Sequence, residues 1–204
     1  MNIGALLKSL IYLISSSLLY PALFLLAFLI LWIIIYAGSF FAEWLERLKL
    51  TGFSAAELSS LLREENDRKI VSHRVVSYLK RLRPLLNGSK IEEIEIENLL
   101  QDDNLKMWKS LDRIRMIIRI GPSLGLIGTL IPMGTGLAAM GQGDMVKLSS
   151  DLVIAFTTTV VGLAIGITAY FFYTVKRRWV EEDIKNMEMA TEIFAINILK
   201  EKKQ

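Results

Sequence analysis

The segments GPSLGLIGTLIPMG (residues 121–134) and AFTTTVVGLAIG (residues 155–166) each lie within a long stretch that carries no charged side chain. These stretches run over residues 120–143 and 152–175. About 20 apolar residues in a helix cross the hydrocarbon core of a bilayer, so both stretches predict transmembrane helices. Thr129 and Thr159 stand among glycines in these spans. Their hydroxyls are mild polar groups that a bilayer tolerates, which makes them the first candidates for contact with an ion.

A third stretch without charge, residues 9–42, precedes them. It is much longer than the apolar part of a cleavable signal, which spans roughly 7–15 residues, so it indicates a retained membrane anchor. The chain has 204 residues, of which 52% are hydrophobic, and this is a high share for a water-soluble domain. We therefore expect an all-α membrane protein with three transmembrane helices and long cytoplasmic helical extensions.

These patterns divide the chain into six segments. They are an N-terminal segment with the first transmembrane helix (1–43), a cytoplasmic helical loop (44–118), the second transmembrane helix (119–143), a short external loop (144–151), the third transmembrane helix (152–175) and a cytoplasmic helical tail (176–204). Two capping boxes, Ser54 to Glu57 and Ser89 to Glu92, predict helix starts within the loop. The helix after the second box is expected to run on into the second span.

The positive charges predict the orientation of the three spans. Of 24 Lys and Arg residues, 15 lie between Arg47 and Arg119 and seven follow Val175. Because cytoplasmic loops of membrane proteins are enriched in Lys and Arg, we expect these two regions to face the cytoplasm. The N-terminus would then face outside, and the protein would lie in the plasma (cell inner) membrane as a multi-pass protein with a cytoplasmic C-terminus.

Charge and composition argue against several classes of function. The net charge is only +3 and 19 of the 21 acids share the expected cytoplasmic segments with the basic residues, so nucleic acid is not an expected partner. The chain has no cysteine and one histidine, which excludes thiolate sites and a histidine cluster. No nucleophile paired with a base and no phosphate-binding loop is visible, so we expect neither an enzyme nor a cofactor or metal site.

The polar and small residues of the spans fall on helical faces. Thr159, Gly162 and Gly166 share one face of the third span, and Gly125, Thr129, Met133 and Gly136 share one face of the second. Small residues allow close helix packing, so the glycines are explained equally well by packing alone and by a functional role. The ion-pathway candidates are Thr129, Thr159 and the neighbouring Thr158, and the candidates for helix packing or a hinge are Gly125, Gly128, Pro132, Gly162 and Gly166.

Pro132 lies inside the second span. Proline lacks the backbone N–H, so it leaves a carbonyl about one turn earlier without its helical donor. Membrane helices accommodate this when hydroxyls or other groups satisfy the backbone. A hinge or an exposed carbonyl for a cation, and a fixed kink, remain alternative interpretations.

The same residues resemble the MotA/TolQ/ExbB proton-channel family, most strongly over residues 121–175. The family pattern of a proline followed by GLLGT is similar to the segment from Pro122 to Thr129, and its ATAIGL pattern is similar to the segment from Thr158 to Leu163. The two family threonines fall on Thr129 and Thr159. Two departures are Thr168, where many ExbB-like and TolQ-like members have proline, and Pro132, which replaces a small residue.

The resemblance implies a ring-like pentamer around the single-span helices of an ExbD-, TolR- or MotB-like partner, which would supply an essential membrane aspartate. It implies a stator or motor subunit that converts the flow of protons, or alternatively of sodium ions, into mechanical work. A competing hypothesis is a membrane scaffold that conducts nothing and uses its glycines and threonines only for assembly. The sequence determines neither the ion nor the driven process.

Overall fold

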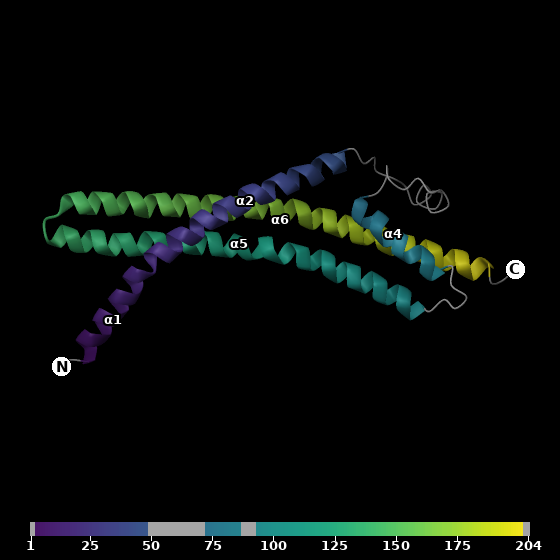
Figure 1. Ribbon diagram of the computed structural model, residues 1–204, viewed down its shortest axis with the longest axis horizontal. Helices are drawn as coiled ribbons and strands as arrows, with labels where there is room; N and C mark the ends of the chain where they lie inside the picture. Colours follow the sequence, from purple (N-terminus) through teal and green to yellow (C-terminus); the bar gives the residue numbers. More distant parts are fainter. Residues whose placement is uncertain (1–2, 49–71, 87–92, 202–204) are drawn as a thin grey trace. The chain divides into compact units, whose positions relative to one another are not determined.

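The computed structural model describes residues 3–48, 72–86 and 93–201, and this part of the chain contains five helices and no strand (Figure 1). Both predicted capping boxes lie outside these ranges. The helices are α1 (Ile3–Ser17), α2 (Leu19–Leu48), α4 (His73–Leu86), α5 (Glu93–Gly141) and α6 (Met145–Glu201). Three stretches are long and apolar enough to cross a membrane, Ser9–Leu48, Ile94–Gly141 and Met145–Ile193, which confirms the predicted number of candidate spans.

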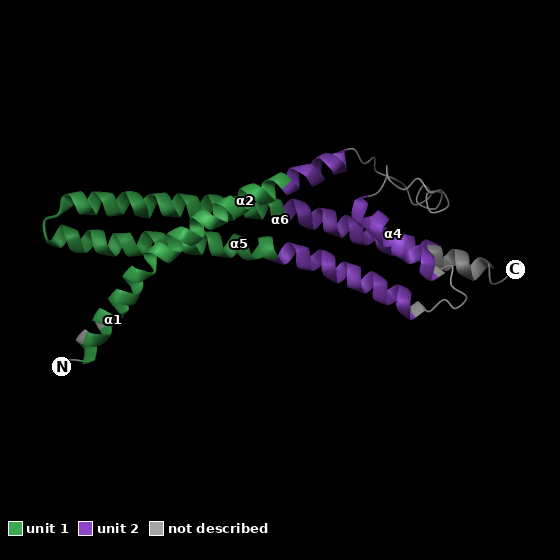
Figure 2. Cartoon of the chain, in the orientation of Figure 1, with its two compact units in different colours: residues 1–38, 113–173 green, residues 39–112, 174–204 purple. Residues whose placement is uncertain are grey.

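The chain forms two compact units (Figure 2). Unit 1 comprises residues 1–38 and 113–173, and unit 2 comprises residues 39–112 and 174–204. Helices α2, α5 and α6 each contribute residues to both units. Unit 1 contains most of the charge-free sequence and therefore the candidate ion pathway, whereas unit 2 contains most of the charged residues.

The first predicted span is two helices, because the chain leaves helical geometry at Leu18. Pro21 provides one cause, since it cannot donate to the carbonyl of Ser17. The hydroxyls of Ser16 and Ser17 provide another, because both donate to the carbonyl of Leu13, at 3.0 and 2.8 Å, in competition with the helical ladder. In unit 1, the ring of Tyr36 on α2 lies 5.9 Å from that of Phe172 on α6.

Helices α5 and α6 are joined by a tight turn at residues 142–144. Gly143 adopts a positive φ of 80°, which glycine tolerates without steric cost. The Asp144 side chain accepts a hydrogen bond from the backbone N–H of Lys147 at 2.9 Å and so caps the start of α6. Because α6 begins at Met145, nearly all of the predicted external loop 144–151 is helical.

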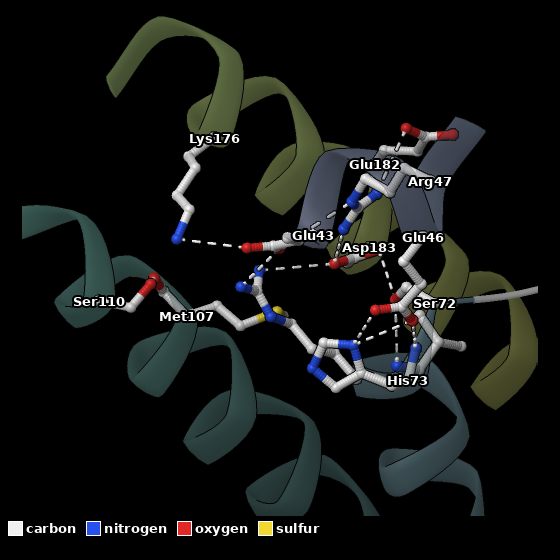
Figure 3. Close-up of polar contacts among 12 residues, drawn as sticks. Glu43, Glu46, Arg47, Ser72, His73, Met107, Ser110, Lys176, Glu182 and Asp183 are labelled. Atoms are coloured by element: carbon white, nitrogen blue, oxygen red, sulfur yellow. Dashed lines mark hydrogen bonds and ion pairs between the residues drawn. The ribbon is translucent and has the colours of Figure 1, made fainter. Parts of the chain in front are cut away.

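The core of unit 2 combines apolar side chains with a buried ionic network (Figure 3). Asp183 of α6 is 1% exposed and accepts hydrogen bonds from Arg47 at 2.5 Å and from Ser72 at 2.8 Å. Arg47 also lies over the ring of Trp179, which stacks on Phe40. This network joins the α2 and α6 portions of unit 2 to the residue that precedes α4.

Candidate functional site: the α5–α6 interface of unit 1

Glycines bring the backbones of α5 and α6 into close contact within unit 1. A Cβ atom added to Gly162 would lie 2.7 Å from the carbonyl oxygen of Gly121 and 2.7 Å from the Cα of Gly125. A Cβ on Gly125 would lie 2.9 Å from the carbonyl oxygen of Thr158, and one on Gly166 would lie 2.7 Å from the ring of Pro122. Only residues without a Cβ fit at such separations, as in small-residue packing motifs of membrane helices.

Thr158 lies in the centre of this interface and is 6% exposed. Its side chain covers Gly128, where an added Cβ would be 2.8 Å from the Thr158 Cβ. The Thr158 hydroxyl is 3.0 Å from the carbonyl of Ile154 and 2.9 Å from that of Ala155. A hydroxyl has only one proton to donate, and these carbonyls use it within α6.

The hydroxyls of Thr129 and Thr159 contact each other across the interface. The Thr129 oxygen is also 2.9 Å from the carbonyl oxygen of Gly125 and 3.2 Å from that of Ala155. The Thr159 oxygen is 3.3 Å from the same Ala155 carbonyl. The two threonines selected from sequence therefore form one polar pair, which we call the threonine pair, and both of them are partly exposed.

Three of the four residues predicted to share a face of the second span meet α6, namely Gly125, Thr129 and Gly136. Met133, expected on the same face as Thr129, is 37% exposed. Besides Ile114 and Ile117, the buried positions of α5 in this unit are four glycines and other compact residues, with Thr129 at the edge of this stripe. They are Gly121, Gly125, Gly128, Pro132, Gly136 and Ala139.

Pro132 is fully buried within α5. The helix continues through it to Gly141, so proline does not end the element. Its missing N–H removes the helical donor for the carbonyl of Gly128, next to Thr158 and the threonine pair. The hinge and the fixed kink remain alternatives.

A carboxylate missed by the sequence prediction lies in the same interface. Asp151 of α6 accepts a hydrogen bond from the Thr135 hydroxyl of α5 at 2.7 Å. Sequence reasoning assigned Asp151 to the external loop because charge was taken to mark the end of the span. Its position four, seven and eleven residues before Ala155, Thr158 and Gly162 was the available signal, since this spacing continues the buried stripe of α6.

The polar groups of unit 1 form two levels along the α5–α6 interface. Thr135 and Asp151 lie at one level and the threonine pair at the next, six residues away on α5 and eight on α6. These offsets correspond to about 9–12 Å of helix. The arrangement offers hydroxyl, carbonyl and carboxylate oxygens, which suit a proton or a small hard cation. The described residues contain no group of three or more His, Cys, Asp or Glu side chains able to hold a metal ion.

The chain is similar to known proteins over much of its length. The model of the MotA/TolQ/ExbB proton channel family matches residues 55–189, which is more than half of the chain. A protein of Methanothermobacter thermautotrophicus, named as a biopolymer transport protein ExbB homolog, is 29% identical over 104 residues. That match covers 50% of this chain and 37% of the relative, and no solved structure matches the chain. The extent of the family match establishes that the chain belongs to the MotA/TolQ/ExbB proton channel family.

Proposed function

We propose that this chain is the channel-forming subunit of an ion-driven motor. It would assemble as a ring, expected to be a pentamer, around a single-span partner that carries a membrane aspartate. Transmembrane movement of protons, or alternatively of sodium ions, would drive relative motion of the partner and perform mechanical work. The observation that carries the proposal is the contact between the Thr129 and Thr159 hydroxyls in a channel-family protein. The proposed orientation is that predicted from charge, with unit 2 in the cytoplasm.

The hydroxyl protons of the threonine pair are already used in hydrogen bonds, so the pair favours a protonated or ion-bound carboxyl group over a charged carboxylate. Two hydroxyls have two protons. If one hydroxyl donates to the other, the second can donate to the carbonyl of Gly125 or Ala155. No O–H then remains for a further group, whereas oxygen lone pairs do. The pair would therefore favour a donor, such as the O–H of a protonated carboxylic acid, or a cation such as sodium.

This preference suggests how ion transfer could be coupled to motion. An intramembrane carboxylate is costly, so a partner aspartate that has taken up an ion can pass the pair more easily than a charged one. Moving one charge through 100 mV releases about 2.3 kcal/mol, which can bias a rotational step. Release of the ion towards the cytoplasm would restore the charged carboxylate and complete one step.

The test is ion flux through proteoliposomes that contain the assembly purified with a tag on this chain. Flux of protons and of sodium under an imposed potential would be compared for wild type, Thr129→Val and Thr159→Val. Losing a hydrogen bond to a neutral carboxylic acid costs about 0.5–1.5 kcal/mol, so we expect flux to fall about two- to tenfold. Thr129→Ser, which keeps the hydroxyl, should restore most of the flux.

Thr157→Val is the matched control, because Thr157 is exposed and its hydroxyl donates within α6 to Val153 at 2.7 Å. It should conduct as wild type does. Membrane hydrogen bonds contribute only about 0.6 kcal/mol on average, so each Thr→Val variant should still fold. Equal flux in wild type and both pair variants would refute the ion-pathway role, and no flux in any of them would favour the scaffold hypothesis.

A further inference from the structure

We infer that Asp151, held by Thr135, is an ion-loading carboxylate of this chain, which receives a proton or sodium ion from the outer side before the ion reaches the threonine pair. The inference rests on the proposed function. It adds a second acidic group to a pathway whose titrating carboxylate was expected only from the partner. The observation behind it is the 2.7 Å hydrogen bond from the Thr135 hydroxyl to the Asp151 carboxylate across the α5–α6 interface.

Capping of α6 does not explain this carboxylate. Asp144 already occupies the capping position and accepts from the Lys147 N–H at 2.9 Å. Asp151 lies seven residues further along the chain, beyond the first turn to which favourable interaction with the helix dipole is confined. Its side chain is directed at α5, where it meets a hydroxyl of another helix.

Ion pairing does not explain the position of the Asp151 carboxylate either. Among the residues that the structure describes, no Lys, Arg or His lies within ion-pair distance of Asp151. The other charged residues at this end of α5 and α6 are Asp144 and Lys147, both exposed. An acid without a cationic partner in a membrane helix bundle is expected to have a functional role.

The surroundings of Asp151 provide further oxygen ligands. The Thr135 hydroxyl lies 3.1 Å from the carbonyl of Pro132 as well as 2.7 Å from Asp151. Its single proton can serve only one of these acceptors fully, so an ion on Asp151 would free the hydroxyl to donate to Pro132. Gly136 permits the close approach, because a Cβ there would be 3.2 Å from the Asp151 Cβ.

The position of Asp151 along α6 fits an entry site. It lies six residues after the helix begins at Met145, and Thr159 lies eight residues further on. At 1.5 Å per residue, an ion on Asp151 would be about 12 Å from the level of the threonine pair along the helix. A carboxylate at the entrance of a pathway raises the local concentration of cations.

The experiment measures flux in the same proteoliposomes as a function of outer ion concentration. Outer sodium is varied at fixed pH and outer pH at fixed sodium, which separates the two cations. For the conducted ion, Asp151→Asn should raise the half-saturating concentration about tenfold and leave the maximal flux largely unchanged. Tenfold is the low end of the range by which charged residues raise the local concentration of counter-ions. Asp151→Glu should restore much of the wild-type affinity, and Asp144→Asn should resemble wild type.

Thr135→Val keeps the carboxylate and removes its hydrogen-bond donor. For a conducted proton it should lower the half-saturating concentration, opposite to Asp151→Asn, because the lost hydrogen bond stabilises the charged carboxylate. For conducted sodium it should raise that concentration, because the hydroxyl oxygen is lost as a ligand. Thr135→Ser should reverse either shift. This variant carries the test if Asp151→Asn fails to fold.

The outcomes separate this inference from the proposed function. An unchanged concentration dependence in Asp151→Asn and Thr135→Val, alongside low flux in Thr129→Val, would overturn the loading role and leave the threonine pathway intact. Equal shifts in Asp151→Asn and Asp144→Asn would also overturn it, since they would reveal a general surface-charge effect. Wild-type flux in both threonine-pair variants would refute the pathway itself and the loading role with it.

Discussion

Replacing Gly162 by alanine should force α5 and α6 apart. The new Cβ would lie 2.7 Å from the Cα of Gly125 and 2.7 Å from the carbonyl oxygen of Gly121. Non-bonded carbon atoms prefer separations of about 3.5–4.0 Å, so the two helices must move apart by about 1 Å. Both opposing atoms belong to the backbone, and no side-chain rotation can relieve the contact.

The energetic cost can be isolated with Gly134→Ala as a matched control. Gly134 is on α5 and an added Cβ there meets nothing within 4 Å. Both substitutions gain about 1 kcal/mol of helix propensity, and this gain cancels in the comparison. Overpacking costs about 1–3 kcal/mol, so Gly162→Ala should be less stable than Gly134→Ala by this amount.

The assay is equilibrium unfolding of the full chain in mixed micelles with increasing sodium dodecyl sulfate, followed by far-UV circular dichroism. Flux provides a second measurement, because a separation of about 1 Å would also pull Thr129 away from Thr159. Stabilities of Gly162→Ala and Gly134→Ala that agree within about 0.5 kcal/mol would refute the close approach of α5 and α6.

Two further predictions concern unit 2. Asp183→Asn removes the nearest carboxylate partner of Arg47, at 2.5 Å, and leaves Arg47 with Glu43 at 4.0 Å and Glu182 at 3.8 Å. It should destabilise the chain by about 1.5–3 kcal/mol in thermal unfolding, whereas Glu182→Gln, at a position 64% exposed, should change little. Similar melting temperatures of the two variants would contradict this. Burial raises the pKa of Tyr78, whose hydroxyl shares a hydrogen bond with Thr191, above its ordinary value of 10.0. The contribution of neutral Tyr78 to the free energy of unfolding is therefore fully present below about pH 10 and is lost as the pH rises through the higher folded-state pKa. Tyr78→Phe should reduce this pH dependence in alkaline unfolding curves.

The continuity of the long helices was partly predictable. The expectation that the helix before the second span would run into it is met by α5, which extends without interruption from Glu93 to Gly141. The break at Leu18 was not predicted, although Pro21 and the three serines before Leu18 were visible. Hydropathy alone could not locate it, because both sides of the break are apolar.

The threonine pair was selected from the sequence, but its partners were not. Composition identifies Thr129 and Thr159 as polar groups in apolar spans, and helical periodicity places glycines near them. Which threonine is buried depends on the rotation of each helix about its axis. The structure places Thr158 against Gly128 in the centre and the threonine pair at the edge.

The amino-acid sequence by itself determined the three apolar spans, their family and the glycines that allow two of them to approach, because these features depend on composition and helical spacing. Only the tertiary structure decided that Asp151 belongs to the interface. Its place depends on where α6 begins and on which residue of α5 lies opposite, and both follow from the turn at residues 142–144 and the packing of one helix against the other.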